Sequence, residues 1–294
     1  MNKYREMMSL HTSMKVGGPA TVYFENENEE ELLLKVRESY RSDAPYIVIG
    51  NGTNIIVRDG GYPGAVFTTN KTLNGVELIE NEKDNASKRI KCGAGESLAN
   101  VCKFAASNGL SGLEALSGIP GTIGGAVVMN AGAYEHEISD VLVMVRAYDI
   151  QNDSIVVLSK PDFEFGYRNS VFKRKQMIVL EAEFELVSDN KADIEARMAE
   201  YRKRRNEKQP MELPSAGSYF KRPEGNYAGK LIEEAGMKGA SVGGAMVSKK
   251  HAGFIVNTGG ATASDVLELA EQVKTKVYNE TGIRLEEEPI VIGI

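Results

Sequence analysis

The apolar positions in the first two thirds of the chain repeat with two periods, one typical of strands and one typical of helices. The apolar run Tyr46–Ile49 ends at a glycine and predicts a buried strand. Residues Ser97–Ser107 carry apolar side chains at helical spacing, and Gly109 lies just past the predicted helix end. Val141–Ile150 and Ile155–Leu158 are joined by a short polar segment and predict a β-hairpin.

The pattern changes toward the last third of the chain. Met177–Val187 predicts another strand, and the polar stretch Lys191–Lys208 predicts a helix that stops before Pro210. We therefore place a domain boundary near residue 204. Beyond it, Ala263–Asn279 predicts a helix with a capping box at its start and a buried apolar stripe, and Pro289–Ile294 predicts a strand.

Composition narrows the class of protein. The chain has 294 residues, with 42% hydrophobic and 26% charged positions, which is ordinary for a globular protein of about two domains. A net charge of -6 argues against general binding to nucleic acid or anionic membranes. We find no signal peptide in the first 25 residues and no apolar stretch long enough to cross a bilayer, so we expect a cytoplasmic protein.

Metal chemistry is not expected. The two cysteines, Cys92 and Cys102, lie ten positions apart, and His11, His136 and His251 are scattered. None of these spacings resembles a zinc motif, and two cysteines are too few for a disulfide framework. We expect core or surface roles for all five residues.

One short motif suggests an acyl-transferring serine enzyme. Ser218–Lys221 matches S-x-x-K, and Ser188–Asn190 matches S-D-N. A nucleophilic serine and its lysine need a helix to share one face, but Gly217 and Pro223 flank this segment and its aromatic residues favour a strand. The order of the two motifs is also reversed, and no K-T-G occurs. We interpret the match as a coincidence.

A single basic cluster, Arg202–Arg205, lies within the helix predicted over Lys191–Lys208. A solvated helix face is the first interpretation. Phosphate binding is the alternative, because arginine forks match phosphate geometry.

The first of two glycine-rich loops, Gly50–Asn54, follows the predicted strand Tyr46–Ile49. Its glycines let backbone amides approach an anion, and Thr53 and Asn54 offer hydrogen bonds. It lacks the third glycine of a Rossmann fingerprint, and strand-like residues replace the expected helix. By itself the loop could equally be a hairpin turn.

The second loop, Gly118–Gly125, is the stronger signal. It has four glycines in eight residues and precedes an apolar stretch, so its amides could bind a diphosphate. Tight backbone packing is the alternative. Two such loops, neither of Rossmann type, favour a dinucleotide held in an unusual way.

The pair of segments VIGNGTNIIVRDGGYPGAV and LSGIPGTIGGAVVMNAGAY resembles the flavin-binding fold of the vanillyl-alcohol-oxidase type. Five more motifs follow the order seen in UDP-N-acetylenolpyruvoylglucosamine reductases: HTSMKVGGPA, FGYRNSVFK, AGSYFKRP, HAGFIVNTGGATASDV and LEEEPIVIG. The resemblance spans nearly the whole chain. It implies an α+β fold with a two-lobed FAD-binding domain at 1–203 (lobes at about 1–68 and 69–203) and a C-terminal α+β substrate-binding domain at 204–294.

The resemblance also implies the reaction. FAD would be bound non-covalently, with NADPH as electron donor and UDP-N-acetylglucosamine enolpyruvate as substrate. The product would be UDP-N-acetylmuramate, in peptidoglycan precursor synthesis, and no obligate protein partner is inferred. The cofactor contacts carried over from the family motifs lie in the two loops: Gly50, Asn51, Gly52, Thr53, Asn54, Ile119, Gly121, Thr122, Gly124, Gly125 and Ala126.

Hydride addition to an alkene conjugated with a carboxylate builds negative charge and leaves a carbon that needs a proton. By resemblance, Arg168 and Glu288 match the charge-stabilising pair and Ser218 the proton donor. Lys221 is our own candidate for stabilising the serine alkoxide. The expected contacts for the UDP diphosphate are Arg204, Lys208, Tyr219, Lys221 and Arg222.

The short spacing between Arg168 and Ser218 leaves no room for the long substrate loop of one family branch, so the chain resembles the shorter, second type. Two residues depart from the pattern: Arg222 replaces a common asparagine, and Glu135 replaces a frequent glycine. The rival functions are another FAD oxidase or dehydrogenase of this fold, and a non-catalytic protein that binds a nucleotide.

Overall fold

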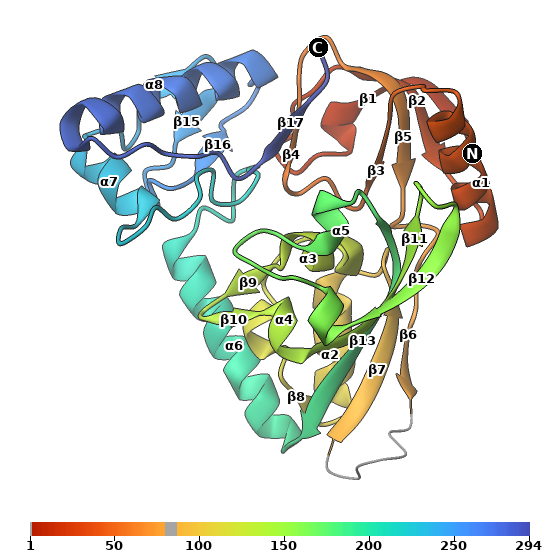
Figure 1. Cartoon of the computed structure of the whole chain (residues 1–294). Coiled ribbons are helices and arrows are strands. Elements are labelled where there is room, and N and C mark those ends of the chain that lie inside the picture. The colour runs from red at the N-terminus through yellow and green to blue at the C-terminus, as the bar shows by residue number, and fades with distance from the viewer. Residues whose placement is uncertain (1, 80–86) are drawn as a thin grey trace. The chain divides into compact units, whose positions relative to one another are not determined.

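The computed structural model describes residues 2–79 and 87–294 (Figure 1). Positions 1 and 80–86, which belong to the predicted FAD-binding domain, lie outside the described residues. The chain forms two compact units, each built from several stretches of sequence. The first unit comprises residue 2 and residues 24–51 and 65–205, and the second comprises residues 3–23, 52–64 and 206–294.

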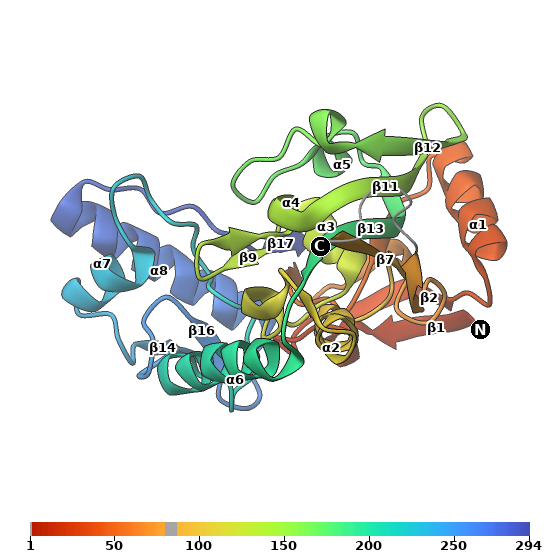
Figure 2. The same ribbon diagram turned by 90° about the horizontal axis from the view of Figure 1, so that it is seen from below.

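A six-stranded antiparallel sheet forms the centre of the first unit, with the order β12-β11-β13-β7-β6 and with β8 added beside β13 (Figures 1 and 2). Its strands are β6 (Val76–Ile79), β7 (Ser87–Gly93), β8 (Leu110–Ser111), β11 (Leu142–Asp149), β12 (Ser154–Ser159) and β13 (Ile178–Ser188). The predicted hairpin is confirmed as β11 and β12, with Val145 opposite Leu158. Buried and less buried positions alternate along β13, as expected for a sheet with one covered face.

Helices of different lengths accompany this sheet along the chain. The helices are α1 (Glu29–Arg41), α2 (Leu98–Ser107), α3 (Ile123–Met129), α4 (Ile138–Val141), α5 (Val171–Arg174) and α6 (Lys191–Lys208), with 3-10 turns at Glu114–Leu116 and Lys160–Asp162. Helix α3 packs on β13 and β7 (Figures 1 and 2). A small hairpin of β9 (Gly132–Ala133) and β10 (His136–Glu137) follows α3.

A second sheet has the order β1-β2-β5-β3, formed by β1 (Asn2–Met7), β2 (Pro19–Glu25), β3 (Tyr46–Ile49) and β5 (Tyr62–Thr68). Strand β3 is the predicted apolar run, and it pairs in parallel with β5. A 3-10 turn, Met8–Leu10, follows β1.

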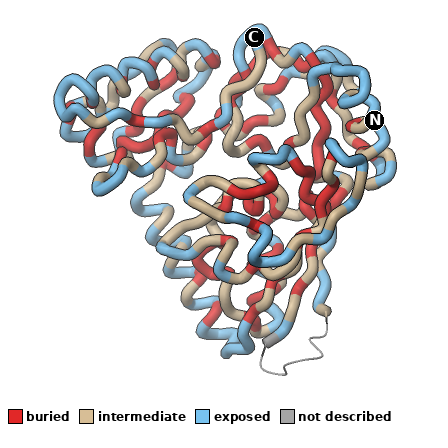
Figure 3. Tube along the Cα trace, in the orientation of Figure 1, coloured by how far each residue is buried: buried red, intermediate tan, exposed pale blue. Residues whose placement is uncertain are grey.

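The second unit combines helices α7 (Ala228–Glu234) and α8 (Ala263–Thr281) with strands β14 (Ser241–Val242), β15 (Ala245–Val247) and β16 (Ile255–Asn257). It also contains a parallel pair, β4 (Ile55–Val57) and β17 (Ile290–Ile292). The predicted stripe of α8 is completely buried, and buried positions recur along this helix in Figure 3. Each valine or leucine of this stripe contributes roughly 1.5–3 kcal/mol to folding.

The start of α8 is held by an early segment of the chain. Thr262 and Asp265 form the predicted capping box. Asp59 adds a second cap, since its carboxylate accepts hydrogen bonds from the backbone amides of Ala263 (2.7 Å) and Ser264 (2.8 Å). A carboxylate at this position also complements the positive end of the helix dipole.

Candidate functional site

The first glycine-rich loop needs both of its glycines for close packing. A Cβ at Gly50 would lie 2.1 Å from Oγ1 of Thr122, and a Cβ at Gly52 would lie 2.1 Å from the carbonyl oxygen of His11. Gly52 also has a φ of +59°, which favours glycine. The loop therefore requires glycine for steric reasons before any ligand is considered.

The second loop leads into α3. Thr122 caps this helix, and the amides of Ile123 and Gly124 donate to the carbonyls of Glu96 (2.9 Å) and Ala94 (2.8 Å). A Cβ at Gly124 would lie 3.0 Å from the Cβ of Ala94. Tight backbone packing, the alternative considered from the sequence, thus accounts for Gly124.

Gly125 differs from Gly124. It is exposed, and a Cβ there would meet only Oγ1 of Thr122, at an ordinary 3.6 Å. Packing within the protein does not require glycine at this position, whereas a bound group lying against the backbone benefits from it. The exposed backbone at Gly125 is therefore compatible with a bound dinucleotide such as FAD lying against this loop.

Asn130 joins the segment after α3 to the loop that carries Arg168. It is buried at the C-terminal end of α3 with a φ of +44°, a conformation that asparagine tolerates better than most residues. Its side-chain amide donates to Glu137 Oε2 (2.7 Å) and to the carbonyl of Gly166 (3.4 Å), and its oxygen accepts from the amide of Ser139 (3.1 Å).

Arg168 lies at the tip of a tight turn in the first unit. Gly166 and Asn169 exchange backbone hydrogen bonds across this turn, and Arg168 itself has a φ of +54°. Its guanidinium donates to the carbonyls of Asn130 (3.4 Å) and Gly132 (3.5 Å). The motifs NAGAY and FGYRNS therefore meet, and the side chain of Arg168 is held by backbone oxygens.

A short antiparallel ladder within the second unit pairs Tyr219 with Glu288 and Lys221 with Glu286, and Ser218 directly precedes this ladder. The amide of Glu288 donates to the carbonyl of Tyr219 (2.9 Å), and the amide of Lys221 donates to the carbonyl of Glu286 (2.8 Å). Residues 218–219 form a bend, Phe220 makes a single bridge to Glu287, and none of residues 218–221 is helical. The S-x-x-K geometry of an acyl-enzyme is therefore absent, as the sequence predicted.

Asn54 ties the first glycine-rich loop to this ladder. Its side-chain amide donates to the carbonyl of Glu288 (3.3 Å), and its own carbonyl accepts from the amide of Ile290 (2.9 Å). Ser13, in the motif HTSMKVGG, connects the same loop to Ser215, which lies shortly before the ladder residues 219–221. Its amide donates to the carbonyl of Gly52 (3.2 Å) and its hydroxyl to that of Ser215 (2.7 Å).

The predicted substrate contacts occupy different environments. Tyr219 is completely buried in the core of the second unit, where its hydroxyl has no hydrogen-bond partner and burial raises its pKa. The Nζ atom of Lys221 donates to Glu286 Oε2 (3.0 Å), and the guanidinium of Arg222 lies 4.1 Å from the ring centroid of Tyr227. Arg204 and Lys208 are exposed, and Arg204 pairs with Glu200.

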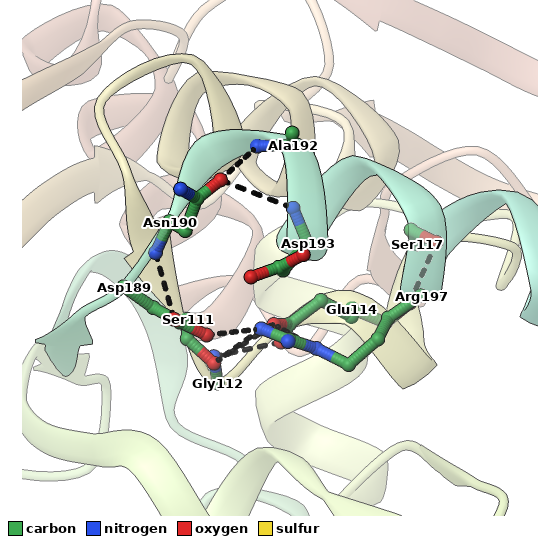
Figure 4. Close-up of polar contacts among 9 residues, drawn as sticks. All are labelled: Ser111, Gly112, Glu114, Ser117, Asp189, Asn190, Ala192, Asp193 and Arg197. Atoms are coloured by element: carbon green, nitrogen blue, oxygen red, sulfur yellow. Dashed lines mark hydrogen bonds and ion pairs between the residues drawn. The ribbon is translucent and has the colours of Figure 1, made fainter.

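The S-D-N segment has a structural role at the start of α6. Asn190 Oδ1 accepts from the amides of Ala192 (2.8 Å) and Asp193 (3.4 Å), which caps the helix (Figure 4). Asp189 accepts from Arg197. Arg197 also binds Glu114 Oε1 (2.7 Å), which anchors α6 to the turn at Glu114 (Figure 4).

The remaining titratable groups give no sign of metal or thiol chemistry. Among the described residues, no group of three or more histidine, cysteine and acidic residues could hold a metal ion. Cys92 and Cys102 are buried, and burial raises the pKa of Cys102 to about 12. No helix in the described part of the chain is long and apolar enough to span a membrane.

Comparison with known proteins decides the family. Residues 209–292 match the C-terminal domain of UDP-N-acetylenolpyruvoylglucosamine reductase, and residues 20–159 match an FAD binding domain. The chain is 44% identical to the UDP-N-acetylenolpyruvoylglucosamine reductase of Caldanaerobacter subterraneus over 98% of its own length and 92% of that protein. The chain belongs to the UDP-N-acetylenolpyruvoylglucosamine reductase family.

Further comparisons agree with this family. The reductase of Clostridium botulinum strain Hall is 44% identical over 98% of this chain and 91% of its own. The crystal structure of the Thermus caldophilus reductase has 37% identity and a TM-score of 0.80, and the match covers 100% of this chain and 98% of that one. The predicted α+β fold with a flavin-binding domain is confirmed, and the chain is a flavin oxidoreductase.

Sequence reasoning missed the residues that connect the motifs. Asn130, Ser13 and Asp59 all lie inside recognised motifs, but their partners are far away in sequence. A usable signal existed for Asn130, since asparagine directly after an apolar helix and before Ala-Gly is typical of a left-handed helix end. Arg205, four positions after Tyr201, continues the stripe of Ile194 and Met198, which marked it as facing inward.

Proposed function

We propose that this chain reduces UDP-N-acetylglucosamine enolpyruvate to UDP-N-acetylmuramate with NADPH and FAD, in peptidoglycan precursor synthesis in the cytoplasm. The identity of 44% to named reductases over nearly the full length supports this reaction. We further propose that the FAD-binding domain spans 1–203 and the substrate-binding domain 204–294. The observation that carries the assignment of reacting groups is the ladder that pairs Tyr219, the neighbour of Ser218, with Glu288 and is tied to Asn54.

The reaction adds a hydride to one carbon of the enolpyruvyl double bond and a proton to the other. Bound FAD supplies the hydride, after reduction by NADPH. The protein has to orient the alkene, stabilise charge that develops toward the carboxylate, and deliver the proton. In our proposal Arg168 and Glu288 stabilise the charge, and Ser218 donates the proton from Oγ to carbon.

Several features of the described residues support these roles. Ser218 is exposed, so a substrate can reach its hydroxyl, and the backbone ladder fixes its spacing to Glu288. Arg168 is held by two carbonyl oxygens, which limits its freedom while leaving it charged. A fixed cation of this kind stabilises developing charge without reorganising during the reaction.

Four cationic side chains are proposed to bind the substrate diphosphate. These are Arg204, Lys208, Lys221 and Arg222, whereas the completely buried Tyr219 does not fit a direct contact with the diphosphate. Lys221 is paired with Glu286, which holds its ammonium at the ladder that follows Ser218. We propose that it stabilises the serine alkoxide after proton transfer.

Two half-reactions test the proposal. The purified holoprotein is expected to be yellow, to be bleached by NADPH under anaerobic conditions, and to regain its colour when the enolpyruvyl substrate is added. In Ser218→Ala, NADPH should still bleach the flavin, while reoxidation by substrate slows by about 100-fold or more, as expected for loss of a general acid. Stopped-flow absorbance of the flavin measures both rates.

Ser241→Ala is the matched control, because Ser241 is an exposed serine of the same unit and lies in β14, away from the ladder. Both of its half-reactions should match those of the wild type. Equal slowing of the two half-reactions in Ser218→Ala would contradict an acid role. Formation of hydrogen peroxide without NADPH consumption would instead support a flavin oxidase.

A further inference from the structure

Arg205 is set apart from the other residues of the basic cluster Arg202–Arg205. Residues 202–204 are exposed, and Arg204 pairs with Glu200 on the same helix. Arg205 lies one helical turn after Tyr201 and is partly buried. It therefore belongs to the inward face of α6. In an ordinary solvated cluster, Arg205 would be exposed like residues 202–204.

The side chain of Arg205 lies against the second glycine-rich loop. A Cβ at Gly118 would be 3.0 Å from its Cδ and 3.5 Å from its Nη1. The β9–β10 hairpin approaches the same part of α6. The ring centroids of Tyr134 and Tyr201 are 4.9 Å apart, and the hydroxyl of Tyr134 donates to the carbonyl of Tyr201 (3.2 Å).

The charge of Arg205 is not matched by the protein. Its Nε atom is buried without a hydrogen-bond partner, and no carboxylate of the described residues forms an ion pair with it. Burial lowers the pKa of its guanidinium, although an arginine stays protonated under ordinary conditions. A buried, unpaired charge is costly, so such groups normally have an anionic partner.

We propose that Arg205 binds the diphosphate of a nucleotide ligand at the second glycine-rich loop. The planar guanidinium offers parallel N–H donors that match phosphate oxygens, and Gly118, which lacks a Cβ, lets the side chain of Arg205 lie against the loop. Two ligands carry this group, FAD and the UDP part of the substrate, and the second of these rests on the proposed function. The alternative is that the stem of Arg205 only packs against Gly118.

Arg205→Met tests the proposal, because methionine keeps most of the apolar stem and removes the charge. Retention of FAD is measured by serial dilution and ultrafiltration of the holoprotein, followed by flavin fluorescence. Binding of UDP is measured by calorimetry on the same holoprotein with FAD in excess. We expect the dissociation constant of one of the two ligands to rise about 10- to 100-fold, as for the loss of a charge-assisted hydrogen bond.

A higher dissociation constant for FAD identifies the flavin diphosphate as the group that Arg205 binds. A higher dissociation constant for UDP alone identifies the substrate diphosphate. Arg205→Lys, which keeps the charge but loses the fork, should give a smaller loss. Arg202→Met is the matched control on the exposed face of α6 and should leave both constants unchanged. Unchanged constants for both ligands in Arg205→Met would overturn the proposal.

Neither measurement involves turnover. A protein that fails to reduce the enolpyruvyl substrate, yet loses FAD on Arg205→Met, would refute the proposed function and leave this inference standing. The unfolding midpoint of each apoprotein shows whether a variant is damaged before it meets a ligand. If Arg205→Met and Arg205→Lys lose both ligands equally, with a matching loss of stability, a packing role replaces the proposed contact.

Discussion

Tyr134 and Glu135 form the two-residue turn between β9 and β10, and both have positive φ values of +55° and +67°. Two such residues in succession are typical of a type I′ turn, where glycine or asparagine is preferred. Glu135 is exposed and stands where the family pattern has glycine. Glu135, which replaces a frequent glycine, thus lies at a strained backbone position, and the turn forms in spite of this strain.

We predict that Glu135→Gly raises the free energy of unfolding by about 0.5–1 kcal/mol. Relief of the left-handed strain of a side chain outweighs the greater flexibility of glycine in the unfolded chain. Urea unfolding of the holoprotein, followed by circular dichroism, measures the difference.

Glu135→Ala serves as the control, because it removes the charge but keeps the Cβ. It should gain much less than Glu135→Gly. A destabilised glycine variant would show that Glu135 makes a stabilising contact that outweighs its strain.

Some roles at the residue scale could be read from the sequence and others could not. The absence of a helix at Ser218–Lys221 was indicated by the flanking Gly217 and Pro223, which are local signals. The helical spacing from Tyr201 indicated that Arg205 faces inward. We missed this because the whole cluster Arg202–Arg205 was first interpreted as a solvated helix face. The catalytic assignments of Arg168, Ser218 and Glu288 depend on family resemblance and stay predictions.

At the scale of elements, α6 is anchored through the pair of Arg197 and Glu114 (Figure 4). Burial raises the pKa of the Glu114 carboxyl, but hydrogen bonds from Arg197 and from the amide of Gly112 outweigh it and hold the pKa below its usual range. The folded pKa thus lies below the unfolded value of about 4.3. Ionised Glu114 stabilises the fold above that value, and this stabilisation is lost as pH falls through the folded pKa.

Glu114→Gln should therefore lower the free energy of unfolding by about 1–3 kcal/mol near neutral pH, since it weakens a charge-assisted pair whose carboxylate is buried. The difference from wild type should shrink as the pH falls below about 4. Urea unfolding at a series of pH values measures it.

Glu200→Gln is the control for this variant, because Glu200 forms an exposed pair with Arg204 on the same helix. It should change stability by less than about 0.5 kcal/mol at every pH. A constant difference between Glu114→Gln and wild type down to acid pH would mean that the charge of Glu114 does not contribute.

Element boundaries were predicted well where local signals set them. The bounds of α6 and β3 match the predicted ranges, and the capping box of α8 is confirmed. Strand order could not be predicted in the same way. The pairing of β13 with β7 depends on contacts between residues that are far apart in sequence, which no local pattern encodes.

At the scale of the whole chain, the second unit is assembled from residues 3–23, 52–64 and 206–294. The parallel pair β4 and β17 joins the middle segment to the last one. The last residues add hydrogen bonds: Arg58 donates to Ile292 (2.9 Å), Gly60 donates to Ile294 (2.9 Å), and Ile294 donates to Gly61 (3.0 Å).

Ending the chain after Glu288 should lower the free energy of unfolding by about 2–5 kcal/mol, because several backbone hydrogen bonds worth roughly 1 kcal/mol each are lost with strand β17. Thermal unfolding of the holoprotein measures this loss. Removal of Ile294 alone eliminates only the two bonds to Gly60 and Gly61 and should cost less. Equal stability of the two truncated chains would show that β17 contributes nothing.

The pairing of β4 with β17 also limits how early the second unit can complete its folding during synthesis. Its partner β17 begins 235 positions later (290 − 55), and a ribosome adds about 5–20 residues each second. Ile55–Val57 must therefore wait roughly 10–50 s for its neighbour, with its edge open to wrong partners. Assembly of the second unit can finish only after nearly all of the protein has been translated.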